Sequence, residues 1–142
     1  MFKVENTVSI NKPVQEVYAY VNDPDTTTKW QGGVEAVKYP PGDPGVGTKY
    51  TEVRKFMGKE MNTTLEVTAL EDNKLYVAKT LDGPVSYEVT VTFEADGEGT
   101  KMTTTVEAEP GGFFKLAEGM VKKQLEQSLQ EDGQRLKSIL EG

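Results

Sequence analysis

Apolar and polar side chains alternate along the first ten residues of the chain. Phe2, Val4, Val8 and Ile10 stand at even positions, and the odd positions from 3 to 9 are polar. A period of two residues is typical of a strand that buries one face. Residues 1–10 are therefore predicted to form the first strand.

The pattern changes after this strand and predicts two short helices. Asn11 and Pro13 form a start signal, because a capping residue precedes a proline whose fixed φ suits the first turn of a helix. Apolar residues then recur at helical spacing until a break at residues 22–25, where the sequence is Asn-Asp-Pro-Asp. Residues 26–30 are expected to form one further turn.

The middle of the chain reads as a run of hairpins. A second strand is predicted over residues 34–39, followed by a loop rich in proline and glycine at 40–47. Two-residue turns are predicted at 58–59, 72–73 and 82–83, and a turn of two or four residues is predicted around 96–97. These turns pair Tyr50 with Val67, Val67 with Ala78, Ala69 with Tyr76, Ala78 with Tyr87, and Val91 with Met102.

The predicted pairs agree on which side chains share a face. Apolar residues from all of these strands fall on one face, and the other face carries mainly threonine, serine and glutamate, as on an antiparallel sheet with one solvated side. Four apolar residues fall on the wrong face and suggest either an irregular register near the middle strand or some cover on that side of the sheet. They are Leu70, Leu75, Val77 and Leu81.

The end of the chain predicts one long helix. Apolar residues recur every three or four positions between residues 113 and 140, where proline is absent. Gly119 and Gly133 lie inside this stretch and allow a kink or a close approach. One sheet and one helix, each with a single apolar face, must pack together. The chain is therefore predicted to be one α+β domain over residues 1–142.

The composition excludes several classes of function. The net charge is -7 and lysines are scattered, so nucleic acid is not an expected partner. Cysteine and histidine are absent, which excludes thiolate and histidine nucleophile schemes and the commonest transition-metal ligands. The chain shows neither a signal-peptide pattern nor an apolar run long enough to span a membrane, so a soluble cytoplasmic protein is expected.

The order of these elements, together with a set of residues spread along the chain, resembles a known fold. The residues are Val8, Ile10, Pro13, residues 17–24, Trp30, residues 44–48, and Gly99 with Thr100. On these grounds the chain is similar to the helix-grip fold of the START-like (SRPBCC) superfamily, which includes the polyketide cyclase/dehydrase family. That resemblance implies a curved antiparallel sheet of about seven strands around a long C-terminal helix, with an apolar tunnel for lipids, sterols, plant hormones or polyketides.

Two charges fall on the predicted inward face. Glu52 and Arg54 lie between Tyr50 and Phe56 on one strand. They form a polar handle in which Arg54 holds a ligand carboxylate or hydroxyl, or they pair with each other near the cavity mouth. The sequence leaves both possibilities open.

The other candidate ligand-binding residues are aromatic, aliphatic or methionine side chains, which suit apolar ligands but also fill ordinary cores. Tyr76 and Tyr87 need hydrogen-bond partners, which a ligand, the backbone or another tyrosine can supply. The predicted ligand-binding set is Trp30, Tyr50, Glu52, Arg54, Phe56, Met61, Leu65, Tyr76, Tyr87, Val89, Met102, Phe114 and Met120.

No metal or cofactor is expected. The loop at 42–47 lacks the Gly-Lys-Ser/Thr ending of a phosphate-binding loop, so it is predicted to be a connection or a cavity gate. The carboxylates Asp23, Asp25, Glu71 and Asp72 stand at turns and caps without a dense ligand pattern. No residue is assigned a catalytic role.

These observations predict a non-enzymatic protein that binds or transports a small hydrophobic or amphipathic ligand, such as a lipid, an isoprenoid or a polyketide-like molecule. The first alternative is a polyketide cyclase or dehydratase that uses Glu52, Arg54 and a tyrosine without metal or histidine. The second is an accessory subunit of the kind that accompanies carbon monoxide dehydrogenase, with a protein partner or as a homodimer.

Overall fold

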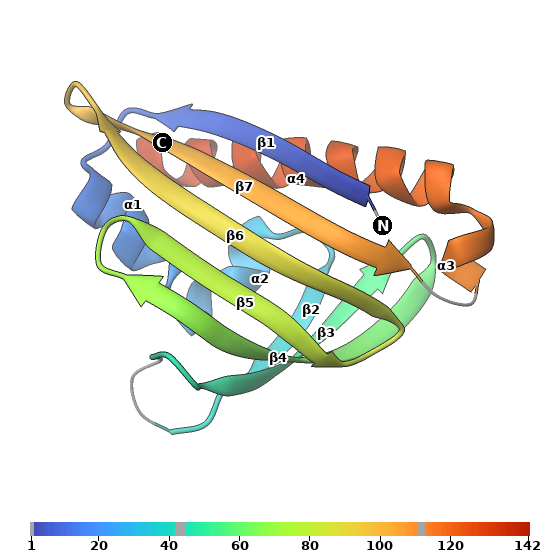
Figure 1. Cartoon of the computed structure of the whole chain (residues 1–142). Coiled ribbons are helices and arrows are strands. Elements are labelled where there is room, and N and C mark those ends of the chain that lie inside the picture. The colour runs from blue at the N-terminus through green and yellow to red at the C-terminus, as the bar shows by residue number, and fades with distance from the viewer. Residues whose placement is uncertain (1, 42–44, 111–112) are drawn as a thin grey trace.

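Seven antiparallel strands form one strongly curved sheet around a long helix (Figure 1). The computed structural model describes residues 2–41, 45–110 and 113–142. The spatial order of the strands is β1-β7-β6-β5-β4-β3-β2. The strands are β1 Phe2–Ile10, β2 Val34–Lys38, β3 Lys49–Phe56, β4 Lys59–Glu71, β5 Leu75–Asp82, β6 Val85–Asp96 and β7 Gly99–Pro110. This arrangement confirms the predicted helix-grip fold.

Short helical segments connect β1 to β2. Helix α1 spans Val14–Val21, a 3₁₀ turn η1 spans Pro24–Thr26, and α2 spans Thr27–Trp30. The Asp23 side chain starts η1 by accepting a hydrogen bond from the backbone N–H of Asp25 at 3.0 Å. Both predicted helices are therefore present, and they lie at one end of the sheet (Figure 1).

Three predicted pairings are wrong by two residues. Tyr50 lies opposite Leu65, Ala78 opposite Val89, and Val91 opposite Thr104. In the first hairpin the turn is formed by Met57 and Gly58, both at positive φ, as a type I′ turn requires. A shift of two residues leaves every side chain on its predicted face, because side chains alternate with a period of two.

The second hairpin keeps its predicted register only in part. Val67 lies opposite Ala78 as expected, but a bulge after Val67 places Ala69 opposite Val77 instead of Tyr76. The bulge inserts one residue and reverses the facing of the residues after it. Leu70 therefore lines the inner side opposite Tyr76, whereas Leu81 is exposed on the outside.

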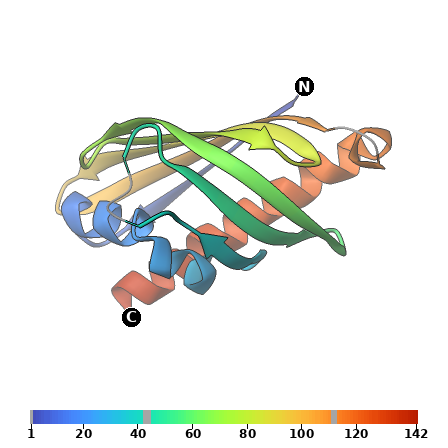
Figure 2. The ribbon, with the colours of Figure 1, turned by 90° about the horizontal axis from the view of Figure 1, so that it is seen from below.

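The predicted helix over 113–140 is two helices. Helix α3 covers Phe113–Leu116 and α4 covers Glu118–Glu141, and Ala117 between them departs from helical geometry. Helix α4 packs along β1, and its C-terminal half lies beside α2 (Figure 2). Leu136 on this half is fully buried with Val8 and Ile10.

Gly133 lets α4 approach β1 closely. A Cβ atom at this position would lie 3.1 Å from the Asn6 amide nitrogen and 3.5 Å from the Cβ of Val8. At Gly119, a Cβ would meet no atom within 4 Å. The first glycine is therefore required by packing, and the second is not.

We expect Gly133→Val to lower the free energy of unfolding by about 1–3 kcal/mol, because the added methyl groups overpack the contact between α4 and β1. Gly119→Val is the matched control and should leave that free energy within about 0.5 kcal/mol of the wild-type value. Urea unfolding followed by circular dichroism measures both. Equal effects of the two substitutions would contradict the packing role of Gly133.

Candidate functional site

A cavity of about 330 Å³ lies between the inner face of the sheet and the helices. Inward side chains of β3 to β7 form most of its wall, and α1, α2 and α4 close it with residues such as Tyr18, Trp30 and Val121. The wall is mainly apolar. Its inward sheet residues are Tyr50, Glu52, Arg54, Phe56, Met61, Leu65, Val67, Leu70, Tyr76, Val85, Tyr87, Val89, Val91, Thr104, Val106 and Ala108.

The structure places most of the predicted ligand-binding residues in this wall. They are Trp30, Tyr50, Glu52, Arg54, Phe56, Met61, Leu65, Tyr76, Tyr87 and Val89. Two methionines require correction: Met102 is 2% exposed in the core beside Ile10 and Leu136, and Met120 is 66% exposed on the outside of α4. The side chain of Phe114 and residues 42–44 of the predicted gate lie outside the described part of the chain.

Glu52 and Arg54 pair with each other inside the cavity. The Nε of Arg54 donates to Oε1 of Glu52 at 2.8 Å, and its Nη2 donates to Oε1 of Gln31 at 2.8 Å. This is the mutual pairing that the second of the two predictions described, and Glu52 is only 6% exposed, so its carboxylate is buried in the wall rather than in open solvent. Burial by itself lowers the pKa of Arg54, but the adjacent Glu52 carboxylate outweighs it and raises that pKa above its usual value. Arg54 is therefore a permanent cation with a fixed counter-ion.

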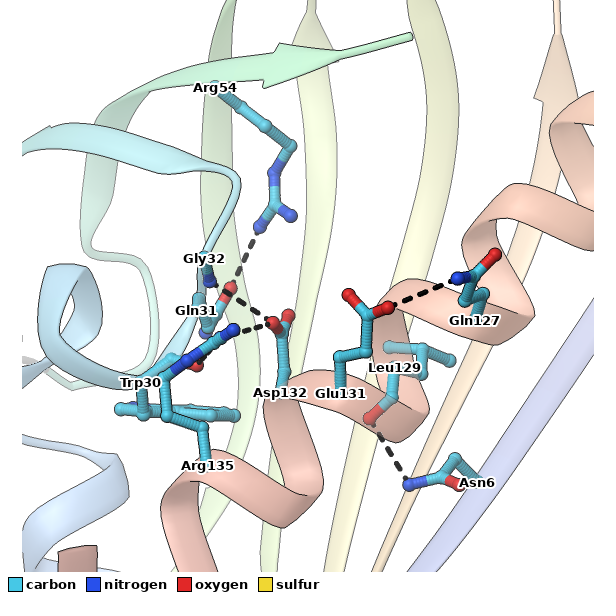
Figure 3. Close-up of polar contacts among 10 residues, drawn as sticks. All are labelled: Asn6, Trp30, Gln31, Gly32, Arg54, Gln127, Leu129, Glu131, Asp132 and Arg135. Atoms are coloured by element: carbon cyan, nitrogen blue, oxygen red, sulfur yellow. Dashed lines mark hydrogen bonds and ion pairs between the residues drawn. The ribbon is translucent and has the colours of Figure 1, made fainter.

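A second set of polar contacts holds the segment between α2 and β2 (Figure 3). The backbone N–H of Gly32 and Nη1 of Arg135 donate to Oδ1 of Asp132 at 3.0 and 3.1 Å, and the same Nη1 donates to the carbonyl of Trp30 at 2.8 Å. Burial raises the pKa of Asp132, while the Gly32 N–H and the charge of Arg54 oppose the rise. The segment that supplies Gln31 to the cavity is thus fixed to α4.

Gln31 and Asp132 are not among the site residues predicted from the sequence. Gln31 follows a short helix and carries no pattern that marks it. Asp132 does carry a signal, since it continues the spacing of Leu125, Leu129 and Leu136 on the apolar stripe of α4. A charge at such a position indicates a buried partner.

Three tyrosines form a cluster in the cavity wall near Glu52. The rings of Tyr39 and Tyr50 stack with centroids 4.6 Å apart, and the hydroxyls of Tyr50 and Tyr76 are 2.7 Å apart. Tyr76 therefore bonds another tyrosine, one of the partners predicted for it. Burial raises the pKa of Tyr39 to about 12 and raises those of Tyr50, Tyr76 and Tyr87, and the charge of Glu52 adds to each rise. These phenols are neutral at physiological pH.

The end of the cavity near α1 contains two polar atoms without partners among the described residues. These are the hydroxyl of Tyr18 and Nε1 of Trp30. Both atoms are enclosed by side-chain packing, and the ring of Tyr18 contacts Phe93 edge to face at 5.2 Å. This end of the cavity therefore offers an aromatic surface rather than accessible hydrogen-bond donors.

Within the described ranges, no group of three or more acidic, histidine or cysteine side chains is placed to hold a metal ion. The helices of this part of the chain include none long and apolar enough to cross a membrane. The arrangement offers an apolar cavity with one internal ion pair, an amide and neutral phenols.

Comparisons with known proteins agree with the fold. A family model described as polyketide cyclase / dehydrase and lipid transport matches residues 1–141. A search of curated proteins gives no match.

Similar solved structures cover nearly the whole chain. They include the Zhui aromatase/cyclase from Streptomyces sp. R1128, with 17% identity over 99% of this chain and 93% of that chain and a TM-score of 0.82. A START superfamily protein from Mycobacterium smegmatis has 16% identity over 98% of this chain and 97% of that one, with a TM-score of 0.78. The protein TTHA0849 from Thermus thermophilus has 23% identity over 97% of this chain and 99% of that one, with a TM-score of 0.77. At these identities the likeness shows a shared fold.

Because the pKa values of these buried tyrosines are raised, their ionisation at alkaline pH is expected to accompany unfolding. A tyrosine whose pKa is higher in the folded chain contributes stability that is complete below about pH 10 and is lost as the pH rises through the folded value, which is about 12 for Tyr39. We expect most phenolate absorbance to appear together with loss of the circular dichroism signal. Titration in denaturant is the control and should show ordinary ionisation near about pH 10. Complete phenolate formation near that pH with the fold intact would contradict the burial of these hydroxyls.

Asp132 is expected to stabilise the segment between α2 and β2. Asp132→Ala should lower the free energy of unfolding by about 1–3 kcal/mol, because the Gly32 N–H and Arg135 lose their acceptor. Glu131→Ala is a control on the same helix. The exposed Glu131 carboxylate accepts only from Gln127 among the contacts drawn in Figure 3, so this substitution should change the free energy of unfolding by less than about 0.5 kcal/mol. Urea unfolding compares the two, and equal values would refute the anchoring role.

Proposed function

The chain belongs to the polyketide cyclase / dehydrase and lipid transport family, and we propose that it binds or transports a small hydrophobic or amphipathic molecule. The observation that supports this most is the cavity of about 330 Å³ between the sheet and α4, lined mainly by apolar side chains. An apolar cavity with a few convergent polar groups is the usual form of a small-molecule site.

The size and shape of the cavity limit the ligand. Its volume stands near the lower end of the range of about 300–1,000 Å³ that is typical of ligand pockets. The wall includes Asn22 at the end of α1, which lies near one end of the sheet, and Val121 and Leu125 near the start of α4, which lies towards the other end (Figure 1). We therefore propose an elongated ligand of modest size, such as a medium-length acyl chain, an isoprenoid or one aromatic polyketide unit.

The polar groups are proposed to orient this ligand. Glu52, Arg54 and Gln31 meet on one side of the cavity, while the rest of the wall is dominated by aliphatic and aromatic side chains. A ligand with one polar end gains hydrogen bonds in only one orientation, because a polar group buried elsewhere in the cavity would lack partners.

Catalysis is a second candidate function, favoured by the same cluster. Glu52 and the neutral hydroxyl of Tyr87 both line the cavity near Arg54, and a carboxylate and a phenol can transfer protons without histidine. The aromatase/cyclase from Streptomyces shares the fold. Under this alternative Glu52→Gln abolishes turnover of a poly-β-ketone analogue while an unreactive apolar probe still binds. No product from the wild-type protein, despite binding of the analogue, would rule it out.

Filling the cavity should weaken binding. Val89 on β6 lines the cavity and packs against all three clusters of buried apolar side chains, so Val89→Trp is expected to weaken binding of the neutral fluorescent probe N-phenyl-1-naphthylamine by at least about tenfold, equivalent to about 1.4 kcal/mol. Thr90→Trp adds the same ring on the opposite face of this strand and should leave binding unchanged. Fluorescence titration measures both variants.

Native mass spectrometry of the wild-type protein and Val89→Trp, purified from the source organism, provides an independent test. A co-purified apolar species should accompany the wild-type protein and be lost from the variant. Equal probe binding by Val89→Trp and the wild-type protein would show that the probe does not enter the cavity, and the proposed function would then fail.

A further inference from the structure

We propose that the cavity selects ligands whose polar group is uncharged and can both donate and accept hydrogen bonds, such as a hydroxyl or a primary amide, and that Glu52 excludes carboxylates. This inference rests on the proposed binding function and narrows its ligand class. It follows from the balance of charges around Arg54.

The described residues of the cavity wall carry more negative than positive charge. Arg54 is the one lysine or arginine among the described residues of the wall, and the wall also includes the carboxylates of Glu52 and Asp72. Behind it, Asp132 is bonded to Arg135. The formal charges of the wall therefore sum to a negative value before any ligand enters.

Arg54 is already engaged on two sides. Its Nε is 2.8 Å from Oε1 of Glu52, and its Nη2 is 2.8 Å from Oε1 of Gln31. The electrostatic effect of Asp132 also reaches Arg54. A guanidinium has five N–H donors, so donors remain for one further acceptor, but the charge itself is neutralised.

A ligand carboxylate would add a second negative charge beside Glu52. Glu52 is 6% exposed, so water screens this repulsion poorly. The field of Glu52 reaches well into the cavity, since it adds to the burial effect that raises the pKa of Tyr39, Tyr50 and Tyr76. A carboxylate that accepts from the remaining N–H groups of Arg54 would lie beside the Glu52 carboxylate, and either this repulsion or the uptake of a proton that relieves it reduces the affinity.

A hydroxyl or a primary amide fits the same groups without this penalty. Its oxygen can accept from a remaining N–H of Arg54, and its O–H or N–H can donate to Oε2 of Glu52, for which no hydrogen bond is found among the described residues. Both members of the pair then gain a bond and no charge is added.

Decanamide and decanoate provide a matched test, because they share chain length and shape and differ in the charge of the polar group. Displacement of N-phenyl-1-naphthylamine from the wild-type protein at about pH 8, where a free carboxylic acid is ionised, should give at least about tenfold tighter binding of decanamide, equivalent to about 1.4 kcal/mol. This measurement requires no variant.

Glu52→Gln should remove most or all of the preference, because it removes the negative charge and leaves Arg54 without a counter-ion. The ratio of the two affinities is expected to fall at least about tenfold in this variant. Glu88→Gln is the matched control, since Glu88 is exposed on the outer face of β6 and the substitution changes the net charge equally. It should leave the ratio at its wild-type value.

The outcomes separate this inference from the proposed function. If decanoate displaces the probe as well as or better than decanamide, the inference is wrong and the binding function stands. The same holds if Glu52→Gln and Glu88→Gln shift the ratio equally. If neither compound displaces the probe, the binding function and the inference both fail.

Discussion

The structure depends on one constraint: the curved sheet has a single apolar face, and one helix is too narrow to cover it. Helix α4 packs along β1 at one edge of the sheet and buries Leu136 and Val121 there. The apolar side chains of the other strands still need shielding from water. The short helices α1 and α2 shield them at one end, and the space left over is the cavity.

That constraint explains why a buried ion pair is tolerated in the wall. Glu52 and Arg54 stand two residues apart on β3, so they share the inward face and are carried away from solvent together. Each would be costly to bury alone, and together with Gln31 they satisfy one another's strongest hydrogen-bonding groups. The pair gives the apolar cavity its polarity without giving it a free charge, and the proposed selection of ligands by the charge of their polar group rests on this arrangement.

The segment between α2 and β2 connects the closed end of the cavity with the polar cluster in its wall. Trp30 and Gln31 both line the cavity, and Asp132 and Arg135 hold their backbone to α4. The same segment therefore closes one end of the cavity and orients the amide that holds Arg54. Stability of the segment and the geometry of the polar cluster are consequently linked.

Local patterns in the sequence were sufficient for the elements and for their inner faces. Alternation placed Tyr50, Leu65 and Tyr87 on the inward side, and this was correct although several hairpins were paired two residues away from their true register. The parity of a strand depends only on the covalent chain, so it survives such an error. The bulge after Val67 changed the parity of Leu70, and it arose from pairing between strands, which no local pattern records.

The sequence by itself thus determined the order and type of the main elements, the apolar inner face, and the presence of Glu52 and Arg54 on it. Only the tertiary structure decided that Met102 fills the core while Met120 lies outside, and that the terminal helix breaks at Ala117. It also decided that Gln31 accepts a hydrogen bond from Arg54 and that Asp132 holds the segment that carries Gln31. The physical reason is separation along the chain. Periodicity is a property of neighbouring residues, whereas Gly32 and Asp132 are 100 positions apart, and their contact depends on how the helices pack over the sheet.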